Sequence, residues 1–69
     1  MERLRNRVKE LREGRQISQK QLAEDTGISR ETIFRLEHDM QDNPSYRVAF
    51  LIASYFGEPV QNVFTYVEE

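Results

Sequence analysis

Apolar residues recur at spacings of three and four along most of this chain, which is the period of amphipathic helices. The most regular stretch runs from Gln19 to Glu37 and is divided by Gly27, where the first of two helices must reverse. Two short helices joined by a glycine turn are typical of a helix-turn-helix, which places its second helix in a groove of DNA. The inward sides of these helices are predicted to carry Leu22, Ala23, Ile28, Ile33 and Leu36.

Capping residues and helix breakers give the ends of the predicted helices. Ser18 and Ser29 precede the two central helices, and a serine hydroxyl there can accept from the free N–H groups of the first turn. Gln21 follows Ser18 at the spacing of a capping box. The helix-turn-helix is therefore predicted over about residues 18–38. Further helices are predicted at 6–13 with Val8 and Leu11 inward, at 45–56, and from Pro59 to about Phe64, with a loop at 39–44.

The fourth predicted helix carries more apolar surface than one small core requires. Its two stripes are Tyr46, Ala49, Ile52, Ala53 and Phe56, and Val48, Leu51 and Tyr55. One stripe can be buried within the monomer, and the other is expected either to meet a partner or to complete the core of a lone monomer. The alternation in residues 63–68 predicts a short strand that pairs with the residues after Met1. A dimerisation region is predicted over about residues 45–67, with the interface residues Val48, Leu51, Tyr55, Val60, Val63 and Tyr66.

Length and composition limit the chain to one small domain over residues 1–69. It has no cysteine and a single histidine, His38, so neither a metal site nor another cofactor is expected. The sequence shows no signal peptide and no apolar run of membrane-spanning length, so we expect a cytoplasmic protein with no membrane partner. An enzyme is not expected, because the sequence lacks the clustered groups of a catalytic site.

The net charge argues against a nucleic-acid partner, but the distribution of charge favours one. The formal net charge is −2, whereas nucleic-acid-binding domains are usually basic. Residues 1–38 carry nine basic and seven acidic side chains, while residues 39–69 carry Arg47 against five acids. The positive excess thus lies in the half that contains the predicted helix-turn-helix. The same arginines can equally form a solvated helix surface.

A set of small, apolar and capping residues recurs at characteristic spacings along nearly the whole chain. They are Ser18-Gln19, Leu22-Ala23, Gly27-Ile28-Ser29, Thr32-Ile33, Leu36-Glu37, Asn43-Pro44-Ser45, Ala49, Ile52-Ala53 and Phe56-Gly57. From Asn6 to Phe64 this joint spacing resembles the Cro/C1-type (XRE) helix-turn-helix family of small phage and bacterial repressors. The resemblance implies an all-α, five-helix, lambda-repressor-like domain that binds double-stranded DNA at a near-palindromic operator as a homodimer. It also implies a sequence-specific transcription regulator, most simply a repressor, whose recognition helix covers residues 29–38.

The outward positions of this recognition helix are those left once its apolar side faces the core, namely Arg30, Glu31, Phe34 and Arg35. Arg30 can donate two hydrogen bonds to the O6 and N7 of guanine, and Glu31 can accept from the N4 amino group of cytosine. Thr32 can serve a phosphate or a base. The alternative for Arg30 and Arg35 is solvation, or a phosphate contact that carries no sequence information.

Residues outside the recognition helix are expected to contact phosphates. Gln19 occupies the position where the second helix of this family begins, and the free N–H groups there suit a phosphate. Its alternative role is helix capping alone. Lys20 is expected to flank the phosphates or only to keep the protein soluble, as are Arg15, Arg3, Arg5, Arg7 and Lys9. The full set expected to contact DNA is Gln19, Lys20, Ser29, Arg30, Glu31, Thr32, Phe34, Arg35 and Asn43.

The resemblance also implies an internal ion pair. In this family a basic residue late in the first helix commonly pairs with a glutamate late in the third, and Arg12 and Glu37 supply these residue types. Such a pair would hold the recognition helix against the first helix, although a partly buried ion pair is weak evidence of net stability.

The chain departs from the family pattern in three places, one of which is the absence of the family's common glycine shortly after Glu37. Phe34 stands where small or polar residues are usual, so we expect it either to touch a thymine methyl or to be buried in the core or an interface. The loop HDMQDNPS is one residue longer than usual, as in SinR-type repressors, and its Asp39 and Asp42 would repel phosphate, although Asn43 can still contribute. These departures leave an alternative: a protein-binding module of the same fold, such as an antitoxin or anti-repressor partner, or a DNA-binding protein controlled by a protein regulator.

Overall fold

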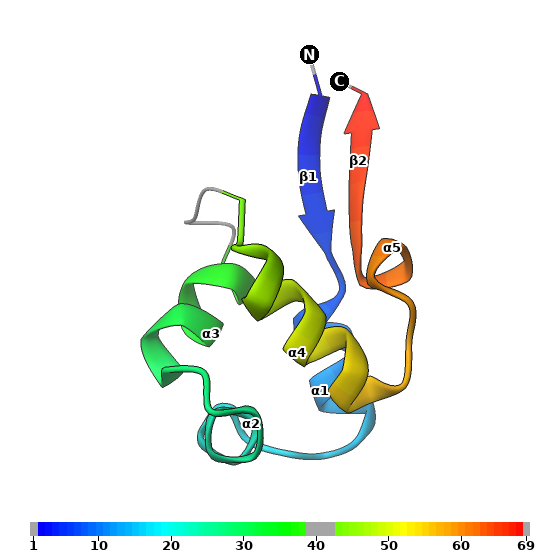
Figure 1. The fold of residues 1–69 in the computed structure, drawn as a ribbon. Coiled ribbons are helices and arrows are strands. Elements are labelled where there is room, and N and C mark those ends of the chain that lie inside the picture. Colours follow the sequence, from blue (N-terminus) through cyan, green and yellow to red (C-terminus); the bar gives the residue numbers. More distant parts are fainter. Residues whose placement is uncertain (1, 39–42, 69) are drawn as a thin grey trace.

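Five helices and a pair of strands make up the part of the chain that the structure, a computed structural model, describes, residues 2–38 and 43–68 (Figure 1). Their order is β1 (Glu2–Asn6), α1 (Val8–Gly14), α2 (Gln19–Thr26), α3 (Arg30–Glu37), α4 (Tyr46–Phe56), α5 (Val60–Val63) and β2 (Phe64–Glu68). The five predicted helices and the predicted terminal strand pair are therefore confirmed.

Serine hydroxyls set the starts of the three central helices. The Oγ atoms of Ser18, Ser29 and Ser45 accept hydrogen bonds from backbone N–H groups three residues later, at 3.0, 3.1 and 3.2 Å. Gly27 and Gly57 follow α2 and α4 in the left-handed region, at φ of 78° and 69°, where other residues are strained. These local signals explain why the predicted bounds of α2, α3 and α4 agree with the structure.

The predicted bounds of the two outer helices were wrong because strands occupy their ends. Asn6 belongs to β1, and its Oδ1 accepts from the N–H of Val8 at 3.0 Å, so α1 begins at Val8. Phe64 belongs to β2, so α5 ends at Val63. The capping box at Ser18 is also incomplete, because the Gln21 amide donates to Asp25 at 2.8 Å.

One hydrophobic core joins the helices to the base of the strands. The predicted inward residues of α1 to α3 lie in or against this core, with Ala23 and Leu11 only half-buried. Such a core fixes the positions of α2 and α3, which pack directly on one another. Its buried members are Val8, Leu22, Ile28, Ile33, Leu36, Ala49, Ile52, Ala53, Phe56, Val63 and Phe64.

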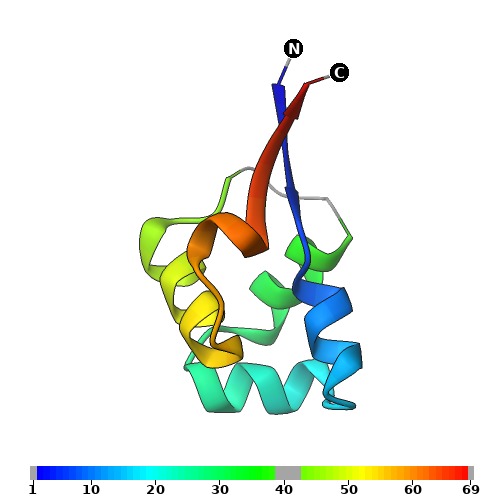
Figure 2. The same cartoon turned by 90° about the vertical axis from the view of Figure 1, so that its right-hand side faces the viewer.

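The strands form an antiparallel pair that brings the two ends of the chain together (Figures 1 and 2). Leu4 lies opposite Tyr66, and Asn6 lies opposite Phe64. Leu4 and Phe64 pack on the helical core, and the Asn6 amide donates to the Leu36 carbonyl at 3.0 Å. The strand pair is thereby attached to the end of α3.

Neither predicted stripe of α4 lies wholly in the core or wholly on the surface. Tyr46 is 77% exposed, although the other members of its stripe, Ala49, Ile52, Ala53 and Phe56, are buried. Val48, Leu51 and Tyr55, expected at a dimer interface, are half-buried against the monomer core. The Tyr55 hydroxyl also donates to Asp25 of α2 at 2.7 Å. This stripe therefore packs partly within the monomer, which leaves less of it to form a dimer interface.

Two further members of the predicted interface have partners within the monomer. Val63 is fully buried, so its place in a dimer interface is a wrong prediction. Val60 is half-buried against the core. Tyr66 is the member that stays largely exposed, because it lies on β2 beyond the helical core.

A buried carboxylate joins α1, α2 and α3. Glu37 accepts from Nε and Nη2 of Arg12 at 2.7 and 3.0 Å, and from the Gln19 amide at 3.1 Å. Its side chain is 1% exposed and that of Arg12 is 13% exposed. Arg12 also donates to the Ile17 carbonyl at 2.8 Å, which ties down the segment before α2. We call Arg12, Gln19 and Glu37 the brace.

The brace keeps Glu37 ionised despite its burial. Desolvation by itself raises the pKa of a carboxyl group. In Glu37 the hydrogen bonds from Arg12 and Gln19, with the charge of Arg12, outweigh that effect and hold the pKa below its ordinary value. The same contacts raise the pKa of Arg12. Both groups are therefore charged at neutral pH.

We expect Glu37→Ala to lower the free energy of unfolding by about 3 kcal/mol, because it leaves a largely buried guanidinium without its carboxylate. In a domain of this size the loss corresponds to a fall in melting temperature of roughly 10–20 °C. The matched control is Glu24→Ala, which removes an exposed carboxylate of α2 and should change stability by no more than about 0.5 kcal/mol. Thermal unfolding followed by circular dichroism tests this, and equal melting temperatures for the two variants would contradict it.

The same carboxylate should make stability depend on pH. Folding lowers the pKa of Glu37 below its ordinary value of 4.5. Between these two pKa values the unfolded chain therefore binds more protons than the folded chain, so stability falls as pH falls through this window. Wild-type protein should lose the contribution of Glu37 in this window, whereas Glu37→Gln lacks it throughout. The stability gap between the two, measured by urea denaturation, should therefore narrow as pH falls below 4.5. A gap that stays constant or widens would disprove the assignment.

Candidate nucleic-acid interface

The α2–α3 unit is held together by local hydrogen bonds as well as by the core. The Thr26 hydroxyl donates to the Leu22 carbonyl at 2.7 Å and accepts from the N–H of Ile28 at 3.3 Å. The chain reverses between them at Gly27, which terminates α2. Ile28 then enters the core. This turn fixes the start of α3 relative to α2.

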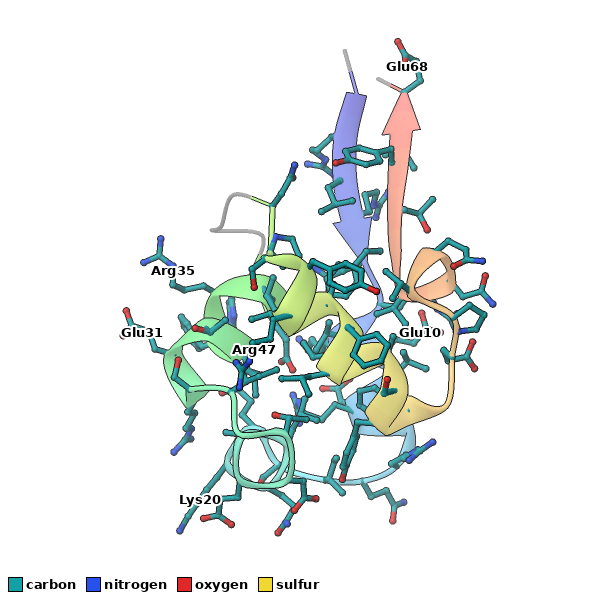
Figure 3. All side chains as sticks on the ribbon, in the orientation of Figure 1. Glu10, Lys20, Glu31, Arg35, Arg47 and Glu68 are labelled. Atoms are coloured by element: carbon teal, nitrogen blue, oxygen red, sulfur yellow. The ribbon has the colours of Figure 1, made fainter. Side chains whose placement is uncertain are left out.

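The outer side of α3 carries charged residues. Arg30 and Glu31 are exposed, and Arg35 is half-buried. Arg35 and Glu31 form an ion pair one turn apart at 4.0 Å. Figure 3 shows both side chains projecting from α3 away from the rest of the molecule. Three of the four predicted outward positions therefore form one charged surface that is accessible along α3.

Ser29 and Thr32 use their hydroxyls within the protein. Ser29 Oγ donates to Thr32 Oγ1 at 2.8 Å while accepting from the Thr32 N–H. Thr32 is half-buried, whereas Ser29 is exposed. The structure thus assigns both residues a capping role at the start of α3, and any contact with DNA would be additional to it.

Two residues at the start of α2 that were predicted to contact phosphates differ in their exposure to solvent. Lys20 is exposed and projects outward in Figure 3. Gln19 is half-buried, because its amide donates to Glu37 in the brace. The brace was not anticipated for Gln19, since its partner lies 18 residues further along the chain. Sequence spacing within α2 carries no signal of that contact.

Phe34 lies on the exposed side of α3. It is 42% exposed, which excludes the predicted alternative of burial in the monomer core. Its ring stacks on that of His38, with centroids 4.1 Å apart, and its carbonyl oxygen lies 2.9 Å from His38 Nδ1. The side chain lies beside the charged residues of α3, where a base or another protein can reach it.

The remaining predicted contacts lie away from α3. The Asn43 amide donates to the Tyr66 hydroxyl at 3.2 Å, so this residue is turned toward the strand pair. Asp39 and Asp42 lie outside the residues that the structure describes. The predicted contact set therefore divides into a group at the α2–α3 unit and a single residue beside β2.

Arg15 has a structural role that its sequence position did not reveal. Its guanidinium donates to the carbonyls of Tyr55 and Phe56 at 3.3 and 3.0 Å and lies 5.1 Å from the Phe56 ring centroid. It therefore satisfies carbonyl groups at the end of α4. The predicted alternatives for Arg15, phosphate attraction or solubility, both missed this contact between residues forty positions apart.

The described residues contain no cluster of three or more metal-ligating side chains. Within the same residues, none of the helices has the length and apolar character needed to cross a membrane.

Comparison with known proteins agrees with this architecture. A family model described as helix-turn-helix matches residues 8–62. An uncharacterised HTH-type transcriptional regulator of Methanocaldococcus jannaschii is 35% identical over 66 residues, covering 96% of this chain and 98% of the relative. Two uncharacterised HTH-type transcriptional regulators of Archaeoglobus fulgidus are 38% and 36% identical, and the matches cover 96% of this chain and 92% and 93% of the relatives. The chain therefore belongs to the Cro/C1-type helix-turn-helix family.

Proposed function

We propose that this protein is a transcription regulator that binds double-stranded DNA sequence-specifically, with α3 in the major groove. Family membership and the similarity to HTH-type transcriptional regulators support DNA binding. We further propose that it binds a near-palindromic operator as a homodimer and represses by excluding polymerase. Such a regulator acts where the chromosome lies, in the cytoplasm.

The observation that carries this proposal is the division of α3 into two sides. Ile33 and Leu36 anchor one side in the core, and Glu37 fixes the end of the helix through the brace. The opposite side presents Arg30 and Glu31 to solvent at the N-terminal end. Residues at the N-terminal end of an inserted helix are those that reach base edges. A rigid support combined with exposed polar groups is what base recognition requires.

Arg30 and Glu31 suit base contacts for different reasons. Arg30 can donate a bidentate pair to guanine O6 and N7. Glu31 would be repelled by phosphates, so its carboxylate is better placed against a cytosine N4 amino group. The ion pair between Glu31 and Arg35 is exposed and long, and exposed pairs contribute at most about 1 kcal/mol, so DNA can replace it.

The backbone contacts would come from the start of α2 and the ends of α3. Lys20 and Arg35 supply positive charge on either side of the reading residues. Gln19 lies at the start of α2, where the helix dipole favours a phosphate, and the brace orients its side chain. Ser29 and Thr32 would add hydroxyl contacts. Asn43 would reach a phosphate only by giving up its bond to Tyr66.

Phe34 supports a second candidate function, a protein-binding module of the same fold. Its exposed ring on the charged side of α3, stacked on His38, would suit an apolar partner. In the favoured function the same ring contacts a thymine methyl. The two functions differ in whether the chain enriches any DNA sequence.

Selection from random-sequence DNA at two salt concentrations tests the proposed function. We expect enrichment of a palindromic consensus, with half-sites whose centres are about 34 Å apart, one turn of DNA. The affinity should fall with salt at a log–log slope of about −0.9 for each phosphate neutralised. Failure to enrich any sequence at low salt would favour the protein-binding module instead.

A single substitution separates base reading from phosphate contact. Arg30→Ala should weaken binding to the selected site by about 1–3 kcal/mol and relax the preference at one base pair of each half-site. The matched control is Arg5→Ala, which removes an exposed arginine from β1 and should leave base preference unchanged. Quantitative binding to single-base variants of the site measures both. Equal weakening on all sequences would reassign Arg30 to a phosphate.

A further inference from the structure

Three large aromatic side chains remain exposed on or beside α4, in addition to Phe34. Tyr46 is 77% exposed, Phe50 is 49% exposed, and Tyr66 of β2 is 57% exposed. We call Tyr46, Phe50 and Tyr66 the aromatic face. Exposed large apolar side chains that gather on one part of a small protein mark a site of association.

Contacts within the structure place two of these rings together and the third near the start of α4. The rings of Tyr46 and Phe50 stack one turn apart on α4, with centroids 5.9 Å apart. The Tyr66 hydroxyl accepts from Asn43, three residues before Tyr46. β2 therefore places its aromatic ring beside the start of α4. Stacking leaves Tyr46 and Phe50 still largely open to solvent.

We infer that the aromatic face is the surface through which two copies of this chain associate about a twofold axis. A symmetric interface brings the same surface of both copies together, so a patch rich in one charge would repel itself. The aromatic face has no charged member. Arg47 is the single charged residue of α4, and in Figure 3 it projects toward the side of α2 and α3. The surface is thus suited to meet a copy of itself.

The exposed area is compatible with a dimer. A phenylalanine or tyrosine can bury about 150–250 Å². At their observed exposures, the three residues leave on the order of 350 Å² to be covered per protomer. A standard interface buries about 800 Å² per partner. The aromatic face would supply nearly half of that area and its central anchors, since aromatic residues dominate the energy of such contacts.

The position of α4 also permits both copies to use α3. Figure 2 shows α4 on one outer side of the molecule with α1 on the opposite side, and Figure 3 shows Glu31 and Arg35 projecting in a different direction from either. A twofold axis parallel to that direction, placed at the aromatic face, turns the second α3 to face the same way. This orientation of the two copies rests on the proposed DNA-binding function, whereas the lack of charge on the aromatic face and its exposed area do not depend on that function.

The inference changes the interface that the sequence predicted. Val48, Leu51 and Tyr55 pack against the core within one protomer, and Val63 is fully buried. Tyr66 remains from the predicted set. Tyr46 and Phe50 replace the other members, because they form the exposed side of α4 next to β2.

Sedimentation equilibrium of the full chain tests the inference. Phe50→Glu should raise the Kd of dimerisation by at least about 30-fold, as expected for a central aromatic anchor. Tyr46→Ser, at the most exposed of these side chains, should act in the same direction if Phe50→Glu impairs folding. The matched control is Phe34→Ser, which removes an exposed aromatic residue of α3 and should leave the Kd unchanged. Circular dichroism verifies that each variant is folded.

Two results would overturn the inference. If folded Phe50→Glu and Tyr46→Ser dimerise as tightly as wild type, the copies associate through another surface. If the wild-type chain is monomeric both free and on DNA, no such dimer exists. The first result leaves the proposed function intact. The second removes its homodimer but not sequence-specific DNA binding, which selection of a DNA site measures separately. Loss of dimerisation in Phe50→Glu with retained binding to a single half-site would support both proposals.

Discussion

The placement of α3 depends on a carboxylate that is almost completely removed from solvent. Glu37 accepts hydrogen bonds from α1 and α2 at the end of the helix opposite to Arg30. A charge with so little exposure is tolerated only because Arg12 and Gln19 compensate it. The core residues hold α3 by one side, and the brace fixes its end. Arg30 and Glu31 belong to neither the core nor the brace, and their exposed side chains are accessible for recognition.

Local chemistry explains which parts of the fold were predictable from the sequence. A serine cap or a left-handed glycine acts on backbone groups within three or four residues, so the bounds of α2, α3 and α4 follow from Ser18, Ser29, Ser45, Gly27 and Gly57. The ends of α1 and α5 depend instead on the pairing of Asn6 with Phe64, 58 residues apart. A helical period alone gives no indication of such a long-range pair.

In the candidate site, too, features set by local sequence were predictable and long-range contacts were not. The exposed positions of α3 follow from its apolar period, because Ile33 and Leu36 fix which side is buried. The family resemblance indicated the Arg12–Glu37 pair, but the hydrogen bond from Gln19 and the carbonyl contacts of Arg15 arise only when distant segments meet. These contacts are tertiary, so residue type and spacing did not distinguish them from phosphate contacts.

The apolar pattern of α4 likewise does not reveal which tertiary contacts the helix makes. Both stripes have helical spacing, and the pattern does not state which one the rest of the chain covers. Val48, Leu51 and Tyr55 are half-buried against the core, and the Tyr55 hydroxyl also donates to Asp25 of α2. The strand pair extends beyond the helical core and leaves Tyr46, Phe50 and Tyr66 exposed beside it. A helix with two apolar stripes thus has one side packed partly against the core and one exposed aromatic side.

The central claim is that α3, supported by the brace, is the element that reads DNA. Amide chemical-shift mapping of the isotope-labelled chain, titrated with a duplex that carries its selected site, tests this most directly. The account predicts that the largest changes lie at Arg30, Glu31 and Thr32, with smaller changes at Gln19 and Lys20. Large changes confined to the strand pair or to Tyr46 and Phe50, with α3 unaffected, would contradict it.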